Sequence, residues 1–148
     1  MKNIVVLILL LSCFNISIAQ EMDFKTIKLL IAKEATVVKE NDNVVEYNFK
    51  GMPLILITDE NANRMRIMAG VVEQSVLKEE DLVTLMEANF DRALDAKYAL
   101  ANGILWSVFA HPLKQLENDQ LIDALYQVRN LVATYGTTYQ STNLQYGK

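Results

Sequence analysis

The fold is decided by one stretch, YALANGILWSVFAHP at residues 98–112, in which Asn102-Gly103 separates two apolar runs. An Asn-Gly pair readily adopts positive φ at both positions, so it closes a two-residue hairpin whose twist matches that of the flanking strands. The register that follows places Leu100 opposite Leu105. The stretch therefore predicts two paired antiparallel strands.

Both faces of this predicted hairpin are apolar. Side chains alternate across a strand, which divides the stretch into two sets. One face carries Ala99, Ala101, Ile104, Trp106 and Val108, and the other carries Tyr98, Leu100, Leu105, Ser107 and Phe109. A hairpin with one face in water is polar on that face. We therefore expect helices to cover one face, and further chain, a second subunit or a ligand to cover the other.

The face formed by Tyr98, Leu100, Leu105 and Phe109 is the candidate partner or dimer surface. Two interpretations stay open. In the first, the chain itself covers these residues as part of its core. In the second, they form an exposed apolar surface for self-association or for another protein.

Hydrophobic spacing predicts the other elements. Helices are expected at about 22–35, 79–94 and 119–135, and further strands at 44–49, 52–57 and 64–72, whereas 36–43 is polar and ambiguous. In the middle helix, one stripe is expected to carry Leu82, Leu85, Met86, Phe90, Ala93 and Leu94. The order α-β-β-β-α-β-β-α indicates an α+β fold, an antiparallel sheet packed by helices.

The N-terminus has the pattern of a secretory signal peptide. A short start with Lys2 precedes an apolar run at 4–11, and small residues precede a cleavage position between Ala19 and Gln20. The apolar run is too short for a stable membrane span. We therefore expect an exported protein, periplasmic or secreted, with residues 1–19 removed. The alternative is a lipoprotein, cleaved before Cys13 and lipidated there.

Length and composition indicate one domain with a true hydrophobic core. The chain has 148 residues, of which 51% are hydrophobic. We assign residues 20–136 to a single α+β domain and 137–148 to a polar C-terminal tail that is expected to be loose. The net charge is −4, and loss of Lys2 would make it −5. An acidic body without a basic cluster argues against nucleic acid and anionic membranes as partners.

No catalytic constellation is recognisable in the sequence. His111 is the one histidine, and Cys13, the one cysteine, lies in the signal, so a zinc site is not expected. The five glycines are scattered and form no phosphate-binding loop. We predict a protein that is not an enzyme and needs no cofactor. The alternative is a small-ligand binder or an unrecognised enzyme, with Tyr98, Ser107 and His111 in a pocket between sheet and helices.

The chain resembles the type III secretion chaperone-like fold, which includes the YbjN-like proteins. An asparagine inside the middle helix and a hydrophobic-Pro-Leu exit from the last strand are the most recognisable points. The resemblance rests on Leu85-Met86-Glu87-Ala88-Asn89-Phe90, Tyr98-Ala99-Leu100, Ile104-Leu105-Trp106, Pro112-Leu113 and the apolar residues from Leu121 to Val132. It contains no catalytic residue.

This resemblance implies a non-enzymatic α+β module, often dimeric, that binds other proteins. Secretion chaperones of that fold work in the cytoplasm, whereas this chain begins with an export signal. We therefore predict an exported protein-binding or chaperone-like module. It would act as a homodimer or with a protein partner, through apolar surface on its sheet or helices.

Overall fold

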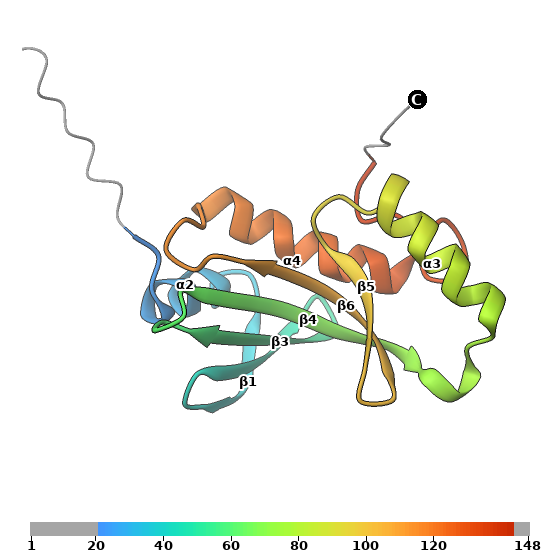
Figure 1. The fold of residues 1–148 in the computed structure, drawn as a ribbon. Coiled ribbons are helices and arrows are strands. Elements are labelled where there is room, and N and C mark those ends of the chain that lie inside the picture. The colour runs from blue at the N-terminus through green and yellow to red at the C-terminus, as the bar shows by residue number, and fades with distance from the viewer. Residues whose placement is uncertain (1–20, 144–148) are drawn as a thin grey trace, which may run out of the picture.

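The computed structural model describes residues 21–143. Within them lie three α-helices: α2 (Phe24–Ile31), α3 (Glu79–Asp91) and α4 (Asn118–Ala133). A short 3-10 helix, η1 (Gln74–Val76), precedes α3. The strands are β1 (Thr36–Asn41), β2 (Val44–Phe49), β3 (Met52–Asp59), β4 (Arg64–Glu73), β5 (Lys97–Ala101) and β6 (Ile104–His111) (Figure 1).

The strands form one antiparallel sheet in the order β1-β2-β3-β4-β6-β5. The predicted hairpin is confirmed, because Leu100 lies opposite Leu105 in the β5–β6 pair. Its turn residues Asn102 and Gly103 have φ of 52° and 75°, the left-handed values that this turn requires. The α+β class predicted from the sequence is confirmed.

Strand β1 is the one strand that the sequence did not predict. All six of its side chains are exposed, so it lacks the alternation that reveals a half-buried strand. It pairs with β2 alone and forms one edge of the sheet. The order in the structure is therefore helix, four strands, helix, two strands, helix.

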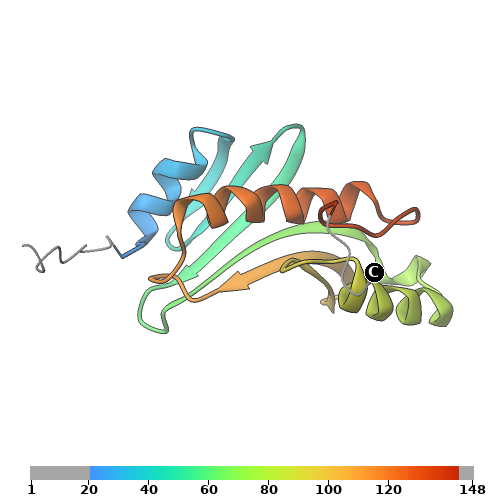
Figure 2. The same cartoon turned by 90° about the horizontal axis from the view of Figure 1, so that it is seen from above.

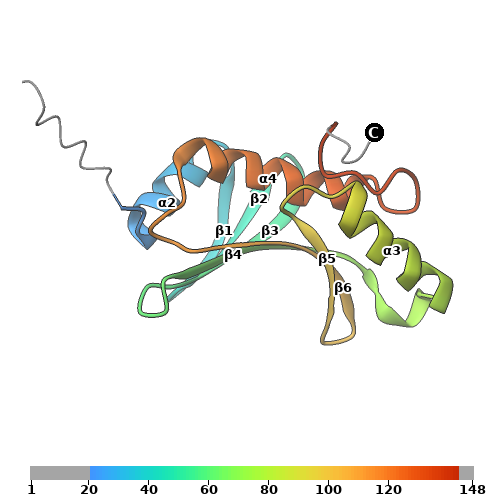
Figure 3. The same ribbon diagram turned by 45° about the horizontal axis from the view of Figure 1, so that its top comes forward.

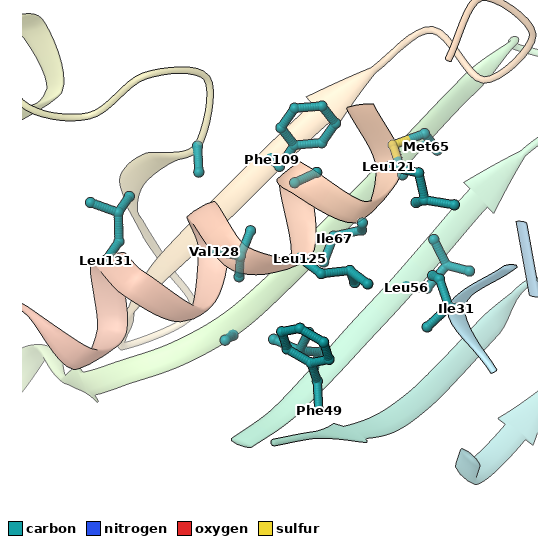
Figure 4. Close-up of a cluster of buried hydrophobic side chains, with 14 of the residues drawn as sticks. Ile31, Phe49, Leu56, Met65, Ile67, Phe109, Leu121, Leu125, Val128 and Leu131 are labelled. Atoms are coloured by element: carbon teal, nitrogen blue, oxygen red, sulfur yellow. The ribbon is translucent and has the colours of Figure 1, made fainter. Parts of the chain in front are cut away.

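Helices α2 and α4 lie on the same face of the sheet, and α3 lies beyond the β5 end (Figures 2 and 3). The core forms between α4 and the strands beneath it. The side chains of Leu121, Leu125 and Val128 lie between α4 and the sheet residues Met65, Ile67 and Phe109, and Leu131 extends the same buried cluster toward the other end of α4 (Figure 4). Burying each such side chain contributes about 1.5–3 kcal/mol, so α4 is the main cover of the sheet.

The segment after α4 packs against the domain as far as the description extends. The Ser141 hydroxyl oxygen accepts a hydrogen bond from the Leu94 amide at 2.7 Å. The Tyr139 ring contacts the Tyr98 ring with centroids 6.3 Å apart. The expectation of a loose tail is therefore wrong for residues 137–143, which hydrogen bonds and ring contacts hold in place.

The signal peptide, its cleavage position at Ala19-Gln20 and the alternative lipidation residue Cys13 all lie outside the described residues. Among residues 21–143, no helix combines the length and the apolarity that a membrane crossing needs.

Candidate protein-binding surface

Helix α4 covers the face that the sequence offered as the partner surface. Tyr98 is 3% exposed, Leu105 is 2% exposed and Phe109 is 4% exposed. Only Leu100, at 41%, is exposed to solvent. The assignment of Tyr98, Leu105 and Phe109 to an exposed surface is therefore wrong for this structure. The other interpretation holds, in which the chain's own helix covers that face.

The polar groups named for a small-ligand pocket do not converge. The Tyr98 hydroxyl donates to the Leu131 carbonyl at 2.7 Å inside the core, and burial raises the pKa of Tyr98. The Ser107 side chain is fully buried, and its hydroxyl has no hydrogen-bond partner among residues 21–143. Two of the three proposed ligand-binding residues are thus part of the core.

His111 lies apart from those two groups, at the end of β6. Its ring stacks on Phe109, and its Nδ1 is 2.8 Å from the Pro112 carbonyl oxygen. It borders a surface hollow of about 320 Å³ that also touches Lys97 and Asp123. Burial lowers the pKa of Lys97, although Asp95 opposes the change. Within residues 21–143, no cluster of acidic and histidine side chains could hold a metal ion.

The opposite face of the sheet is apolar and has no helix over it in the described part of the chain (Figure 3). Its central side chains are half-buried and do not pack against the main core. We call this surface the open face, and define it by Ile55, Ile57, Met68, Trp106 and Val108.

Strand register brings the open face together. Ile55 of β3 lies opposite Met68 of β4, and Met68 lies opposite Val108 of β6. Neighbouring strands are about 4.8 Å apart, so these three side chains form a continuous apolar row across the centre of the sheet. Residues far apart in the sequence thus build one surface.

Trp106 lies at one end of this surface, where a hydrogen bond to the backbone holds its ring. Its indole Nε1 donates to the Ala101 carbonyl at 3.0 Å, which satisfies its only polar group. Its ring lies near Gly70, where an added Cβ would be 3.9 Å from the ring carbon Cζ3. The ring therefore presents apolar area with no polar atom to solvate.

Charged side chains border the open face. Glu46 lies opposite Ile55, and Arg66 lies opposite Ile57. A shallow hollow of about 360 Å³ at this border is lined by Ile57, Arg64 and Arg66 among others. An apolar centre with a polar rim is the usual anatomy of a protein–protein interface.

The two edges of the sheet differ in how their backbone groups are satisfied. At the β5 edge, the Tyr98 amide donates to Asn89 Oδ1 at 2.7 Å, and Asn89 Nδ2 donates to the Tyr98 carbonyl at 3.0 Å. The Asn89 side chain thus takes the place of a neighbouring strand. At the β1 edge, no side chain of residues 21–143 forms such a pair of bonds. The β1 edge is therefore open to a further strand.

The fold matches solved structures, although no family model matches the chain and no curated protein matches its sequence. One similar chain comes from the structure of the HopA1–SchA chaperone–effector complex, with 11% identity and a TM-score of 0.52. The match covers 66% of this chain and 77% of that one. A second comes from the ExsC–ExsE complex, with 17% identity and a TM-score of 0.44. It covers 68% of this chain and 72% of that one.

The first of these matches supports the fold assignment. The chain has an α+β fold like that of a chain in a chaperone–effector complex, in agreement with the resemblance to the type III secretion chaperone-like fold. At 11% identity the likeness concerns the fold alone. The relation to YbjN-like proteins stays a prediction.

Sequence reasoning found the apolar alternation that underlies the open face, but it offered the opposite face of the hairpin as the candidate partner surface. The alternation around Asn102-Gly103 shows that Trp106 and Val108 share an apolar face. The available signal was the surrounding strands, because Ile55, Ile57 and Met68 extend the Trp106 face over β3 and β4.

Proposed function

We propose that this protein is an exported, non-enzymatic protein-binding module that works in a chaperone-like manner through the open face. The observation that carries the proposal is that this face is apolar although no helix of the described chain covers it. The likeness to a chain of a chaperone–effector complex agrees with this role. Export is inferred from residues 1–19 of the sequence alone.

The energetic reason is the cost of leaving the open face in water. Each Å² of apolar surface removed from water contributes about 25 cal/mol. A solvated antiparallel sheet face normally carries polar side chains, whereas Ile55, Met68 and Val108 form an apolar row here. A protein that covers this row removes from water the apolar surface that the chain's own helices leave exposed, and this burial favours binding.

We further propose that a second copy can occupy the open face, giving a homodimer. A two-fold axis would place the same patch of each copy against the other. Trp106 and Met68 would then contribute the largest apolar side chains at the contact. A dedicated partner protein would displace or replace this second copy.

The test is a pair of charge substitutions. Met68→Asp places a carboxylate in the apolar row and should abolish self-association and partner capture. Leu29→Asp is the matched control, since Leu29 is 60% exposed on α2, away from the open face. Self-association is measured by light scattering, and partners by mild crosslinking in the native envelope followed by mass spectrometry.

Loss of the complex in Met68→Asp but not in Leu29→Asp supports the proposal. Survival of both the dimer and the captured partner in a folded Met68→Asp protein contradicts it. Sequencing the N-terminus of the exported protein tests the export signal separately. A mature chain that starts at Gln20 is expected, whereas a lipid-modified Cys13 would establish the lipoprotein alternative.

A further inference from the structure

Helix α3 exposes a second apolar surface, distinct from the open face. Of the apolar stripe predicted for the middle helix, Leu85 and Ala93 are buried, the latter beyond the end of α3, but the other residues of the stripe within α3 are exposed. Leu82 is 39% exposed, Met86 is 59% exposed and Phe90 is 86% exposed. Residues spaced by four lie one above another on a helix, so these three form a continuous apolar row. Helix α3 is tied to the β5 edge and lies beyond the sheet (Figure 1), which leaves this row uncovered.

A second row runs beside the apolar row and is acidic. Its four residues are again spaced by four; three of them are acidic, Glu79, Glu87 and Asp91, and the fourth is the exposed Val83. Asp91 pairs with Arg92 at 3.0 Å. Glu79 and Glu87 have no ion pair among residues 21–143. Helix α3 contains no lysine or arginine of its own.

We propose that α3 binds a basic amphipathic helix of a partner protein. The apolar residues of that helix would pack on Leu82, Met86 and Phe90, and its lysines or arginines would face Glu79 and Glu87. Helix-in-groove and helix-on-helix recognition reads apolar anchors at spacings of three and four, and opposite charges beside them fix the register. This surface acts independently of the open face.

Charge decides between this occupant and the two alternatives. A second copy of α3 would bring a second set of carboxylates, because the helix carries Glu79, Glu80, Asp81, Glu87 and Asp91. Like charges side by side are unfavourable. An anionic membrane surface would repel the same row. A basic helix removes both the exposed apolar area and the unpaired charge.

The test uses two synthetic helical peptides of about 15 residues, a length at which isolated helices become stable. The first contains Leu, Ala and Lys, with the leucines on one face and the lysines beside them. The second has Glu in place of every Lys. Binding to the full chain, purified after export, is measured by fluorescence anisotropy. We expect the basic peptide to bind at least about tenfold more tightly than the acidic one, and less tightly as salt rises.

Variants locate the binding. Phe90→Asp should weaken the basic peptide about tenfold, because Phe90 is the most exposed anchor. Glu87→Lys should weaken it about fivefold and improve binding of the acidic peptide. Glu34→Lys is the matched charge control, since Glu34 lies in the exposed turn after α2; it should have little effect. Trp106→Ser should leave peptide binding unchanged.

Three outcomes would overturn the inference. They are equal binding of the two peptides, equal effects of Glu87→Lys and Glu34→Lys, and unchanged binding in a Phe90→Asp protein with normal thermal unfolding. Dimerisation that is lost in Phe90→Asp would assign the row to a second copy instead. Because Trp106→Ser disturbs the open face and leaves α3 intact, failure of the proposed function can be told apart from failure here.

Discussion

The two faces of the sheet have similar apolar content but different surroundings. Phe109 and Val108 are adjacent in β6, yet Phe109 is 4% exposed beneath α4 whereas Val108 lies on the open face. The difference comes from one helix, since α4 covers a single face (Figure 2). An apolar strand therefore does not reveal whether its side chains belong to the core or to an interface.

The largest expected effect separates these two neighbours. Phe109→Asp buries an unpaired charge and removes a ring from the core, so it should destabilise folding by more than about 4 kcal/mol. Val108→Asp places its charge on the open face and should cost about 1 kcal/mol. Urea unfolding of both variants gives the comparison. Equal losses of unfolding free energy in the two variants would contradict the burial of Phe109 beneath α4.

High pH should lower the free energy of unfolding, because two tyrosines are buried on the face that α4 covers. Burial raises the pKa of Tyr47 from 10.0 to about 12 and also raises the pKa of Tyr98. The unfolded chain releases these protons near pH 10, whereas the folded chain keeps them. The stabilisation is therefore complete below pH 10 and is lost as pH rises through about 12.

Through Tyr47, raising the pH from below 10 to 12 should lower the free energy of unfolding by about 2 kcal/mol. Tyr47→Phe removes it and should flatten the dependence of unfolding free energy on pH between 9 and 12. The Tyr47 hydroxyl has no hydrogen-bond partner within residues 21–143, so the variant should fold as stably as the parent at pH 7. A Tyr47→Phe protein with an unchanged alkaline slope would contradict the burial of this hydroxyl.

The β5 edge offers a smaller effect. Asn89→Ala removes both bonds to the Tyr98 backbone and should cost about 1–2 kcal/mol. Hydrogen exchange of the Tyr98 amide should speed up in this variant. Asn61→Ala is the control, because Asn61 is exposed in the β3–β4 loop. Unchanged exchange in Asn89→Ala would mean that another group protects this edge.

Local patterns in the sequence predicted the elements better than their arrangement. Asn102-Gly103 fixed the β5–β6 register, because only a tight turn fits between those apolar runs. Strand β1 escaped prediction because every side chain in it is exposed. The burial of Phe109 depends on α4, whose position follows from long-range packing that no local pattern contains.

The same limit applied to the candidate binding surface: local patterns revealed the apolar faces but not which of them is covered. The sequence showed two apolar hairpin faces and an apolar stripe on α3, all of which exist in the structure. It offered Tyr98, Leu105 and Phe109 as a candidate partner surface, with burial by the chain itself as the alternative. The structure buries all three residues, whereas Phe90 of the predicted stripe is exposed. An alternating apolar pattern shows that a strand face is hydrophobic, but which helix covers that face depends on the packing of the whole fold.

Trp106 provides the most direct test of the central claim, because it is the only tryptophan in the chain and lies on the open face. The measurement is acrylamide quenching of its fluorescence as the protein self-associates or binds a captured partner. If the open face is the contact surface, quenching should fall and the emission should shift to shorter wavelength as the complex forms. A complex that forms while the quenching and emission of Trp106 stay unchanged would contradict the account.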